Sequence, residues 1–298
     1  MKRIRNITTL LDLTYIDPIM AEYSAFFSGI AEAEKVFFLH VIQEYNLPDK
    51  GGRELPDGET LYRAIQDRIR EEVENHFNTT VPFAIETRAE TEDASNAIVE
   101  FINETETDIV LIGQKYGANR EARYGHKISA KAGSDTLFVP ETATSAINKI
   151  LCAIDCSDHS EEAFRKALDL SAKTGAEMAS YFLYDTTRSY FPATTLSSAA
   201  MEQERSRKQY GKFLERFDLT PDIIPCHYKE LGPSENQAEG VYEAAVTENA
   251  DFLVLGAAGD PGTATSLLGN LAENLYHMEK KIPLLIVRNQ ETKRFGWL

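Results

Sequence analysis

A repeat of 143 residues constrains this chain more than any other feature of its sequence. The segment Asp108–Gly113, an acid followed by four apolar residues and a glycine, returns as Asp251–Gly256. A second pair of residues, Asp12 and Asp155, each ends a short apolar run and lies at the same offset. Two independent matches at one spacing indicate a duplicated unit. The length of 298 residues agrees, because it suffices for two domains of ordinary size.

Each half of the chain alternates short apolar segments with longer amphipathic ones. Strands are predicted in the first half at 7–13, 36–42, 81–87, a segment ending at Gly113, and 136–139, and in the second half at 149–155, 178–184, 222–228, a segment ending at Gly256, and 283–287. Helices are predicted between them, among others at 60–77, 94–104, 201–217 and 238–249. Continuous apolar strands that alternate with helices are typical of parallel sheets covered on both faces.

The predicted fold is therefore α/β, with two tandem open, mostly parallel five-stranded sheets and helices on both faces of each. The first domain is expected at 1–142 and the second at 148–298, joined by a short polar linker. The first helix of each half shows an apolar stripe at helical spacing. Asp17 is expected to cap this helix in the first half, with Pro18 in its first turn. The stripes are Ile19, Tyr23, Phe26, Phe27 and Ile30 in the first half and Phe164, Ala167, Leu168, Ser171 and Ala172 in the second.

Composition narrows the classes of partner. The 31 Lys and Arg residues are outnumbered by 47 Asp and Glu residues, so the formal net charge is −16. A negative field of this size repels nucleic acid and anionic membranes, and neither is expected as a partner. No apolar run approaches the roughly 20 residues that span a bilayer. The apolar N-terminal stretch is interrupted by Asp12 and Asp17, which argues against a signal peptide. The expected location is the cytoplasm, where three cysteines would stay reduced.

The chemistry is concentrated after the fourth predicted strand of the second half. Gly256 and Gly259 are separated by two residues, and nine further residues lead to Gly269 and Asn270. In open α/β sheets ligands bind at the carboxyl ends of the strands. A glycine without a Cβ lets its amide approach a bulky anion, and the N-terminus of a helix favours phosphate. Asn270 is a suitable N-cap for such a helix, with Glu273 as its partner in a capping box.

This layout resembles the nucleotide-binding signature of the universal stress protein family, in which the third glycine is followed by Ser or Thr. Asn270 stands at that hydroxyl position. The resemblance implies an adenine-nucleotide α-hydrolase-like fold and a bound ATP, with a divalent ion such as Mg2+ held through the phosphates. It also implies that Asp155 lies near the nucleoside and that the main chain at Leu183 reads the adenine edge. The implied nucleotide-binding residues are Ala153, Asp155, Leu183, Gly256, Gly259, Gly269 and Asn270.

The first half departs from this signature. Tyr116 stands where the second glycine belongs, and Gly125 comes one residue early for the third. A tyrosine there is expected to occupy phosphate space, so the first half is predicted to have lost triphosphate binding. Its loop is locally basic, which fits either a solvated helix face or a site for another anion or an acidic partner. The basic residues are Lys115, Arg120, Arg123, Lys127 and Lys131, opposed by Glu121.

Catalytic signatures are missing from the sequence. It contains no P-loop, no Gly-x-Gly-x-x-Gly after a strand and no Gly-x-Ser-x-Gly elbow. The six histidines form no metal-ligand spacing, so neither catalytic nor metal-ligating side chains are predicted. Asp260 is the only acid on the glycine loop, so ATP hydrolysis is expected to be slow at most.

The preferred function is therefore a stress-response regulatory or sensor protein that binds ATP in its second domain. A nucleotide-free scaffold that binds proteins, and a slow ATPase or other enzyme of unrecognised type on the same fold, are the alternatives. The protein partner is not identified by the sequence. Since domains of this family commonly pair through their last strands, the two halves are expected to pair within one chain across 136–139 and 283–287. A homodimer is a further arrangement that exposed strand edges allow.

Overall fold

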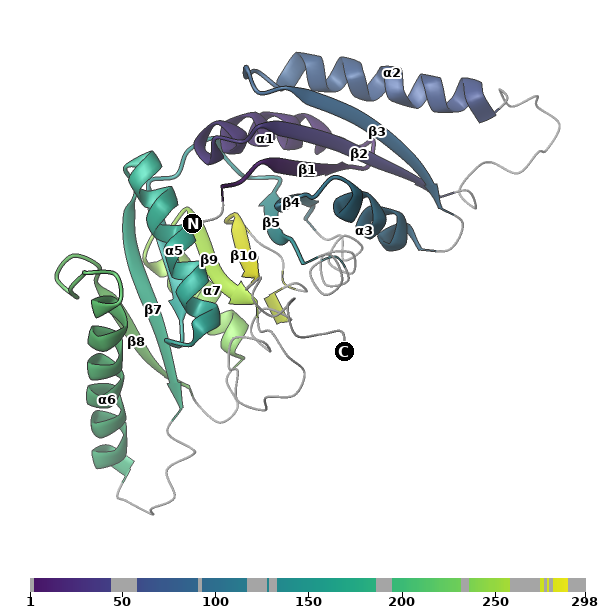
Figure 1. Cartoon of the computed structure of the whole chain (residues 1–298). Coiled ribbons are helices and arrows are strands. Elements are labelled where there is room, and N and C mark those ends of the chain that lie inside the picture. The colour runs from purple at the N-terminus through teal and green to yellow at the C-terminus, as the bar shows by residue number, and fades with distance from the viewer. Residues whose placement is uncertain are drawn as a thin grey trace, which may run out of the picture. The chain divides into compact units, whose positions relative to one another are not determined.

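The chain folds into two units, each built around five parallel strands (Figure 1). The first unit contains residues 1–145 and 279–283, and the second contains 146–278 and 284–298. The structure is a computed structural model that describes residues 3–43, 58–90, 93–116, 128, 133–185, 195–231, 236–257, 274–275, 278 and 281–288.

The first unit has the strand order β3-β2-β1-β4-β5, with every pair parallel. Its strands are β1 (Asn6–Leu11), β2 (Lys35–Gln43), β3 (Phe83–Glu90), β4 (Ile109–Gln114) and β5 (Asp135–Pro140). Its described helices are α1 (Asp17–Ala31), α2 (Gly58–His76) and α3 (Ala94–Glu104). Figure 1 shows α1 and α2 on one face of the sheet and α3 on the other. Both faces are thus covered, as the apolar strands require.

The second unit repeats this order as β8-β7-β6-β9-β10, again with parallel pairs. Its strands are β6 (Lys149–Ile154), β7 (Glu177–Asp185), β8 (Cys226–Leu231), β9 (Phe252–Ala257) and β10 (Leu284–Arg288). Its described helices are α5 (Asp158–Thr174), α6 (Thr195–Glu215) and α7 (Gln237–Thr247). Helix α5 packs on the central strands β6 and β9, and α6 packs on β7 and β8.

The duplication read from the sequence is visible in the elements themselves. Strand β1 begins at Asn6 and β6 at Lys149, 143 residues later, and the same offset relates α3 to α7 and β4 to β9. All six residues of β4 are buried, as are all six of β9. Strands buried on both faces carry their hydrophobic residues continuously, which is why the sequence pattern locates them well. The predicted α/β fold with parallel sheets is confirmed.

The start of α1 differs from the prediction. Asp17 does not cap the helix, since Ile16 occupies the N-cap position without a side-chain hydrogen bond. The Asp17 carboxylate instead accepts hydrogen bonds from the main-chain amides of Asp12, at 3.2 Å, and Leu13, at 2.8 Å. The carboxylate therefore closes the turn before the helix, and Pro18 still lies in the first helical turn, as predicted.

The buried faces of the first helices are rotated from the predicted stripes. In α1, Ser24 and Ser28 are buried while Phe26 is partly exposed. The Ser24 hydroxyl lies 2.6 Å from the main-chain oxygen of Met20 and 2.6 Å from the Thr9 hydroxyl, so the serine is satisfied inside the core. The predicted α1 residues Tyr23 and Phe27 are buried, whereas Ile19 and Ile30 are partly exposed; in α5, Phe164 and Ala167 are buried, Leu168 and Ser171 are intermediate and Ala172 is exposed.

Prolines account for two strand boundaries that begin later than predicted. Strand β3 starts at Phe83, directly after Pro82, and β8 starts at Cys226, directly after Pro225. The residues before β8 form a turn in which Ile223 donates to the main-chain oxygen of Thr220 at 3.0 Å. Proline has no amide hydrogen and so contributes only its carbonyl to a ladder, as Pro225 does to the amide of Ser180 at 2.8 Å.

Candidate functional site

The second sheet has a topological switch point between β6 and β9. The chain runs from β6 outward through β7 to β8 and then returns to the other side of β6 as β9. The last paired residues of these two central strands are Ala153 and Leu255. Asp155 and Gly256 follow them, so both lie at the carboxyl edge where the two crossovers diverge. In open α/β sheets this crevice is the usual place of ligand binding.

The turn from Asp155 to Ser157, here called the β6–α5 turn, is held by hydrogen bonds between residues close in sequence. The Asp155 Oδ1 atom accepts from the amide of Ser157 at 2.9 Å. The Ser157 hydroxyl caps α5 by accepting from the amide of Ser160 at 3.3 Å, as an N-cap residue should. Cys156, between them, adopts the left-handed conformation at φ 60°. The turn therefore presents a carboxylate and a helix N-terminus at one edge of the sheet.

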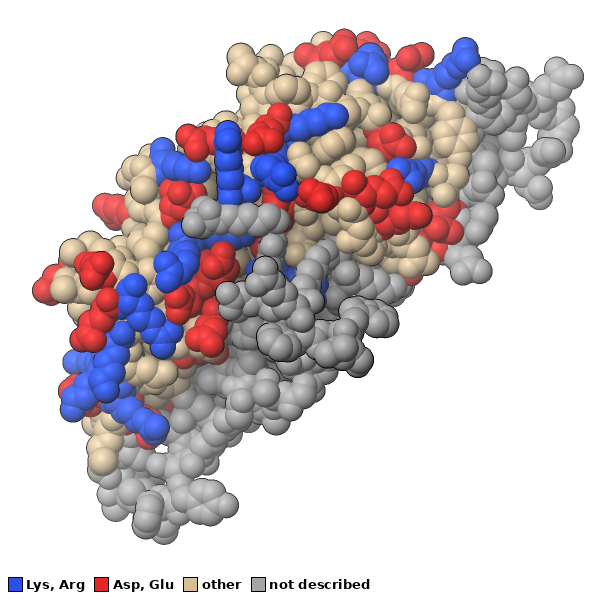
Figure 2. All heavy atoms as spheres, viewed as in Figure 1, with Lys and Arg blue, Asp and Glu red and all other residues tan. Residues whose placement is uncertain are grey.

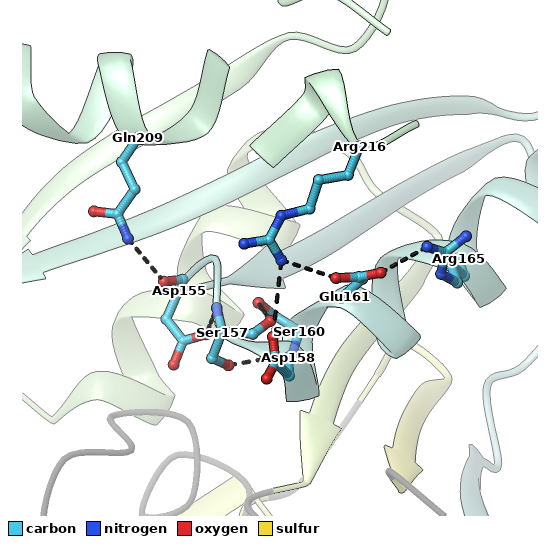
Figure 3. Close-up of polar contacts among 8 residues, drawn as sticks. All are labelled: Asp155, Ser157, Asp158, Ser160, Glu161, Arg165, Gln209 and Arg216. Carbon is cyan, nitrogen blue, oxygen red and sulfur yellow. Dashed lines mark hydrogen bonds and ion pairs between the residues drawn. The ribbon is translucent and has the colours of Figure 1, made fainter. Parts of the chain in front are cut away.

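Helix α6 contacts this turn, and Arg216, which directly follows α6, contacts the first turn of α5 (Figure 3). The Gln209 side-chain amide donates to the main-chain oxygen of Asp155 at 3.4 Å. Arg216 donates to Glu161 at 2.8 Å and lies 3.8 Å from a carboxylate oxygen of Asp158. Arg165 reaches the other oxygen of Glu161 at 2.6 Å, and this hydrogen bond, followed by that from Arg216, lowers the pKa of Glu161. The carboxylate is thus held in its charged form.

Leu183 lies at the same edge, on β7. The pairing of β7 with β6 ends at Phe182, opposite Ile154, so Leu183 is the next residue beyond that ladder. On its other side Leu183 pairs with Lys229 of β8. Its side chain is buried, so a ligand at this edge would meet the main chain of Leu183.

The structure brings some of the predicted site residues together and leaves others outside its description. Leu183, Asp155 and Gly256 lie near the carboxyl ends of three strands that are adjacent in the sheet, β7, β6 and β9. Ala153 is buried within β6, opposite Leu255. Gly259, Gly269 and Asn270 lie outside the described residues.

Sequence reasoning missed the contribution of α6. Its exposed side borders a groove of about 770 Å3, and one of the groove residues, Gln209, also contacts the β6–α5 turn. Lys and Arg side chains gather over α6, with acidic side chains among them (Figure 2). The residues that line the groove are Ala200, Met201, Glu204, Arg205, Lys208, Gln209 and Lys212. A charged helix of this composition resembles any solvated helix, so no local signal marks it as part of a site.

The three cysteines beside this region are free thiols. Burial raises the pKa of Cys152 and of Cys156, and it raises the pKa of Cys226 to about 12. Cys152 and Cys226 flank Ser180 across three neighbouring strands. Because the thiolate is the reactive form, these residues are protonated and weakly nucleophilic at neutral pH.

The switch point of the first sheet, between β1 and β4, is occupied by charged side chains. Lys115, which follows β4, forms an ion pair with Asp12, which follows β1. The Lys115 side chain is only 13% exposed, against 40% for Asp12. Burial raises the pKa of Asp17 to about 7, although its two amide hydrogen bonds and the charge of Lys115 act in the opposite direction. The neighbouring His40 ring lies 2.9 Å from the main-chain oxygen of Leu11, and burial lowers its pKa.

Two observations bear on the first-half loop. Tyr116 is 74% exposed, and Lys115 lies against Asp12 at the switch point. Lys115 is an ion-paired residue rather than part of a solvated basic face. Gly113 has close neighbours of its own, because a Cβ there would lie 3.1 Å from the Met20 sulfur. Gly117, Arg120, Glu121, Arg123, Gly125, Lys127 and Lys131 lie outside the described residues.

Comparison with known proteins identifies the class. Residues 146–288 match the model of the universal stress protein family. A functionally unknown protein from Pseudomonas aeruginosa PAO1 and a putative universal stress protein from Pseudomonas aeruginosa UCBPP-PA14 each superpose with a TM-score of 0.65 at 14% identity, covering 97% of this chain and 94% of theirs. A universal stress protein from Archaeoglobus fulgidus also gives 0.65 at 14% identity, covering 96% of this chain and 97% of its own.

The match to the universal stress protein family thus lies in the second half of the chain, and nearly the whole length has the fold of these structural neighbours. No curated protein sequence matches it. Within the described part of the chain, no helix has the length and hydropathy needed to cross a bilayer. The same described residues contain no group of three or more His, Cys, Asp or Glu side chains placed to hold a metal ion.

Proposed function

We propose that the second unit binds an adenine nucleotide, with ATP as the ligand, and that the chain is a regulatory or sensor protein of the stress response. The observation that carries this proposal is the convergence of Asp155, Leu183 and Gly256 at one switch point. The match of the second half to the model of the universal stress protein family supports it. The spacing from Gly256 to Gly269 supports a phosphate loop in the same segment.

Each residue has a distinct proposed role. Asp155 uses one carboxylate oxygen within its own turn, and its second oxygen would accept a hydrogen bond from the nucleoside. The main chain at Leu183 would read the adenine edge. Gly259, Gly269 and Asn270 would bring amides to the phosphates, with a divalent ion such as Mg2+ held through the phosphate oxygens. Since Asp260 is the only acid on that loop, hydrolysis is expected to be slow at most.

The first unit is proposed to bind no triphosphate. Its switch point is already filled by the ion pair between Lys115 and Asp12. A ligand would have to displace Lys115 from a largely buried position and compete for the carboxylate that matches Asp155. We also propose that the chain is cytoplasmic, that it has a protein partner and that its two halves pair with each other.

Ligand stoichiometry tests the proposal. Native mass spectrometry of the purified chain should detect co-purified adenine nucleotide, and calorimetry on the nucleotide-free protein should give one ATP per chain. Folded protein that binds no adenine nucleotide would favour the scaffold function instead. Two equivalent sites would contradict the proposed difference between the two units.

A further inference from the structure

One side chain of α6 reaches the peptide that joins Asp155 to Cys156. The Gln209 Nε2 atom lies 3.4 Å from the Asp155 oxygen of that peptide, and Figure 3 shows the amide directed from α6 towards it. A hydrogen bond to this oxygen restrains the peptide plane. The plane sets ψ of Asp155 and φ of Cys156, and therefore the direction in which the chain leaves β6.

This peptide is where the turn most needs support. Cys156 has φ 60°, a left-handed conformation that residues other than glycine rarely adopt. Within the turn, the amide of Ser157 donates across the strained residue to the Asp155 carboxylate, and the amide of Ser160 donates to the Ser157 hydroxyl. Gln209 acts from a different element, on the main-chain oxygen of Asp155. The glutamine therefore adds a restraint on the main chain of the residue before Cys156, beside the hydrogen bond that its carboxylate accepts.

Helix α6 does not depend on Gln209 for its own position. Phe213, one turn further along, is buried and packs against Phe164 with ring centroids 5.2 Å apart. The Tyr210 hydroxyl donates to the main-chain oxygen of Ile224 at 2.9 Å. Arg216 ties the end of the helix to Glu161 of α5. Removal of the Gln209 amide should therefore leave the helix in place.

In the first unit, the second helix contacts the first helix, but the turn after β1 is supported by a residue of the first helix. Its second helix is also tied to its first helix, because His76 of α2 lies 2.9 Å from a carboxylate oxygen of Glu22 in α1. The turn after β1 is held by Asp17 of α1 itself. A tie between the two helices is thus common to both units, whereas a glutamine contact to the turn is seen in the unit that carries the glycine motif.

From this geometry we propose that Gln209 is a positioning residue of the nucleotide site, which fixes the orientation of Asp155 and makes α6 part of the site. The proposal rests on the proposed function. Gln209 also lines the groove beside α6, so the same side chain contacts both the groove and the turn that carries Asp155. A nucleotide that orders Asp155 would, by reciprocity, strengthen the contact between the turn and α6.

Three substitutions at this position test the role by calorimetry with ATP and by thermal unfolding. Gln209→Ala should weaken ATP binding about three- to tenfold, the range expected for one hydrogen bond. Gln209→Glu should weaken it at least as much, because a carboxylate cannot donate to the Asp155 oxygen at neutral pH. Gln209→Lys keeps a donor and should retain more affinity than either. Gln203→Ala, which truncates the same side chain elsewhere on α6, is the matched control and should bind as the wild type does.

A double-mutant cycle separates positioning from general stability. In an Asp155→Ala background the Gln209→Ala substitution should have no further effect on affinity, because its target no longer contributes. An equal loss in both backgrounds, or wild-type affinity in both Gln209→Ala and Gln209→Glu, would overturn the inference. Failure of the wild type itself to bind any adenine nucleotide would instead overturn the proposed function. If Gln209→Ala is too unstable to study, the ATP affinities of Gln209→Lys and Gln209→Glu test the inference. Tighter binding by Gln209→Lys would support it, and equal affinities would contradict it.

Discussion

The two switch points of this chain have the same topology and different chemistry. In the first unit, Asp12 is neutralised by Lys115, and the turn that follows β1 is closed by the buried carboxylate of Asp17. In the second unit, Asp155 bonds to its own turn, and Gly256 is the penultimate residue of β9. Strand order and pairing are shared, so the difference comes from a few side chains just beyond the strand ends. A fold places a site, and local residues decide its chemistry.

The difference also concerns how each turn is supported. Asp17 supports the first turn from within the same helix–turn segment, four or five residues from the amides that it accepts. Gln209 supports the second turn from a separate helix, 54 residues away. A turn supported locally depends little on its neighbours. A turn supported by another element can report its state to that element, which suits a regulatory protein.

The largest expected effect comes from filling the phosphate space of the second unit. Gly259→Val should reduce ATP affinity by roughly 100-fold or more, because the branched Cβ would occupy the space that the phosphates approach. Calorimetry with ATP measures the loss, and circular dichroism checks that the protein is folded. The matched control is Tyr116→Val, at the corresponding position of the first unit, which should leave affinity unchanged. Wild-type affinity in a folded Gly259→Val protein would mean that Gly259 is not part of a phosphate-binding loop, and that such a loop does not distinguish the two units.

The next effect concerns the acid that closes the first turn. The folded-state pKa of Asp17 is raised from 3.8 to about 7, so the folded chain keeps a proton that the unfolded chain releases. The free energy of unfolding should therefore fall as pH rises from about 4 to about 7, by up to about 4 kcal/mol from this group. Asp17→Asn cannot titrate, so its stability relative to the wild type should rise across that window.

Urea unfolding of both proteins between pH 4 and 8 measures this difference. The control is Asp158→Asn at the first residue of α5, where the side chain is 89% exposed and the turn is held by other groups. Its stability should follow the wild type at every pH. Parallel curves for Asp17→Asn and the wild type would show that the buried carboxylate titrates normally, and that the first turn carries no acid-dependent support.

Sequence patterns located the strands of both sheets and most helix boundaries. Continuous apolar runs such as Ile109–Gln114 have few alternatives to a buried parallel strand, and α3 has the predicted bounds. The rotation of helix faces was not predictable from hydrophobicity. Ser24 is buried because it finds hydrogen-bond partners in Thr9 and Met20, which periodicity alone does not show.

Within the candidate site, the strand-end residues were predictable and their partners were not. Asp155 and Gly256 end apolar segments, so their place at the sheet edge followed from the pattern. The ion pair of Lys115 with Asp12 joins residues 103 positions apart, and its partner depends on β1 and β4 being neighbours. The contact of Gln209 depends in the same way on how α6 packs. Long-range contacts of polar side chains leave no periodic signal in the sequence.

The smallest expected effect tests whether Lys115 alone keeps the first switch point closed. Lys115→Met retains an apolar side chain of similar length and removes the charge that pairs with Asp12. Since the Asp12 side chain is 40% exposed, the ion pair should contribute less than about 1 kcal/mol to stability, and less still at high salt. Urea unfolding at low and high ionic strength measures this contribution.

The number of ATP molecules bound per chain of Lys115→Met shows whether the Lys115 ion pair or the missing glycine accounts for the difference between the two units. One ATP per chain is expected to remain, because Tyr116 still replaces the second glycine and no amide-lined loop is created. The control is Lys149→Met, which breaks a comparable ion pair, 3.2 Å from Glu248, at the start of β6 and away from both switch points. A second ATP bound by Lys115→Met, and not by the control, would mean that the first unit retains a usable phosphate loop. The two halves would then differ by one displaceable cation rather than by the loss of the glycines, and Lys115 would be the residue that sets the stoichiometry of the chain.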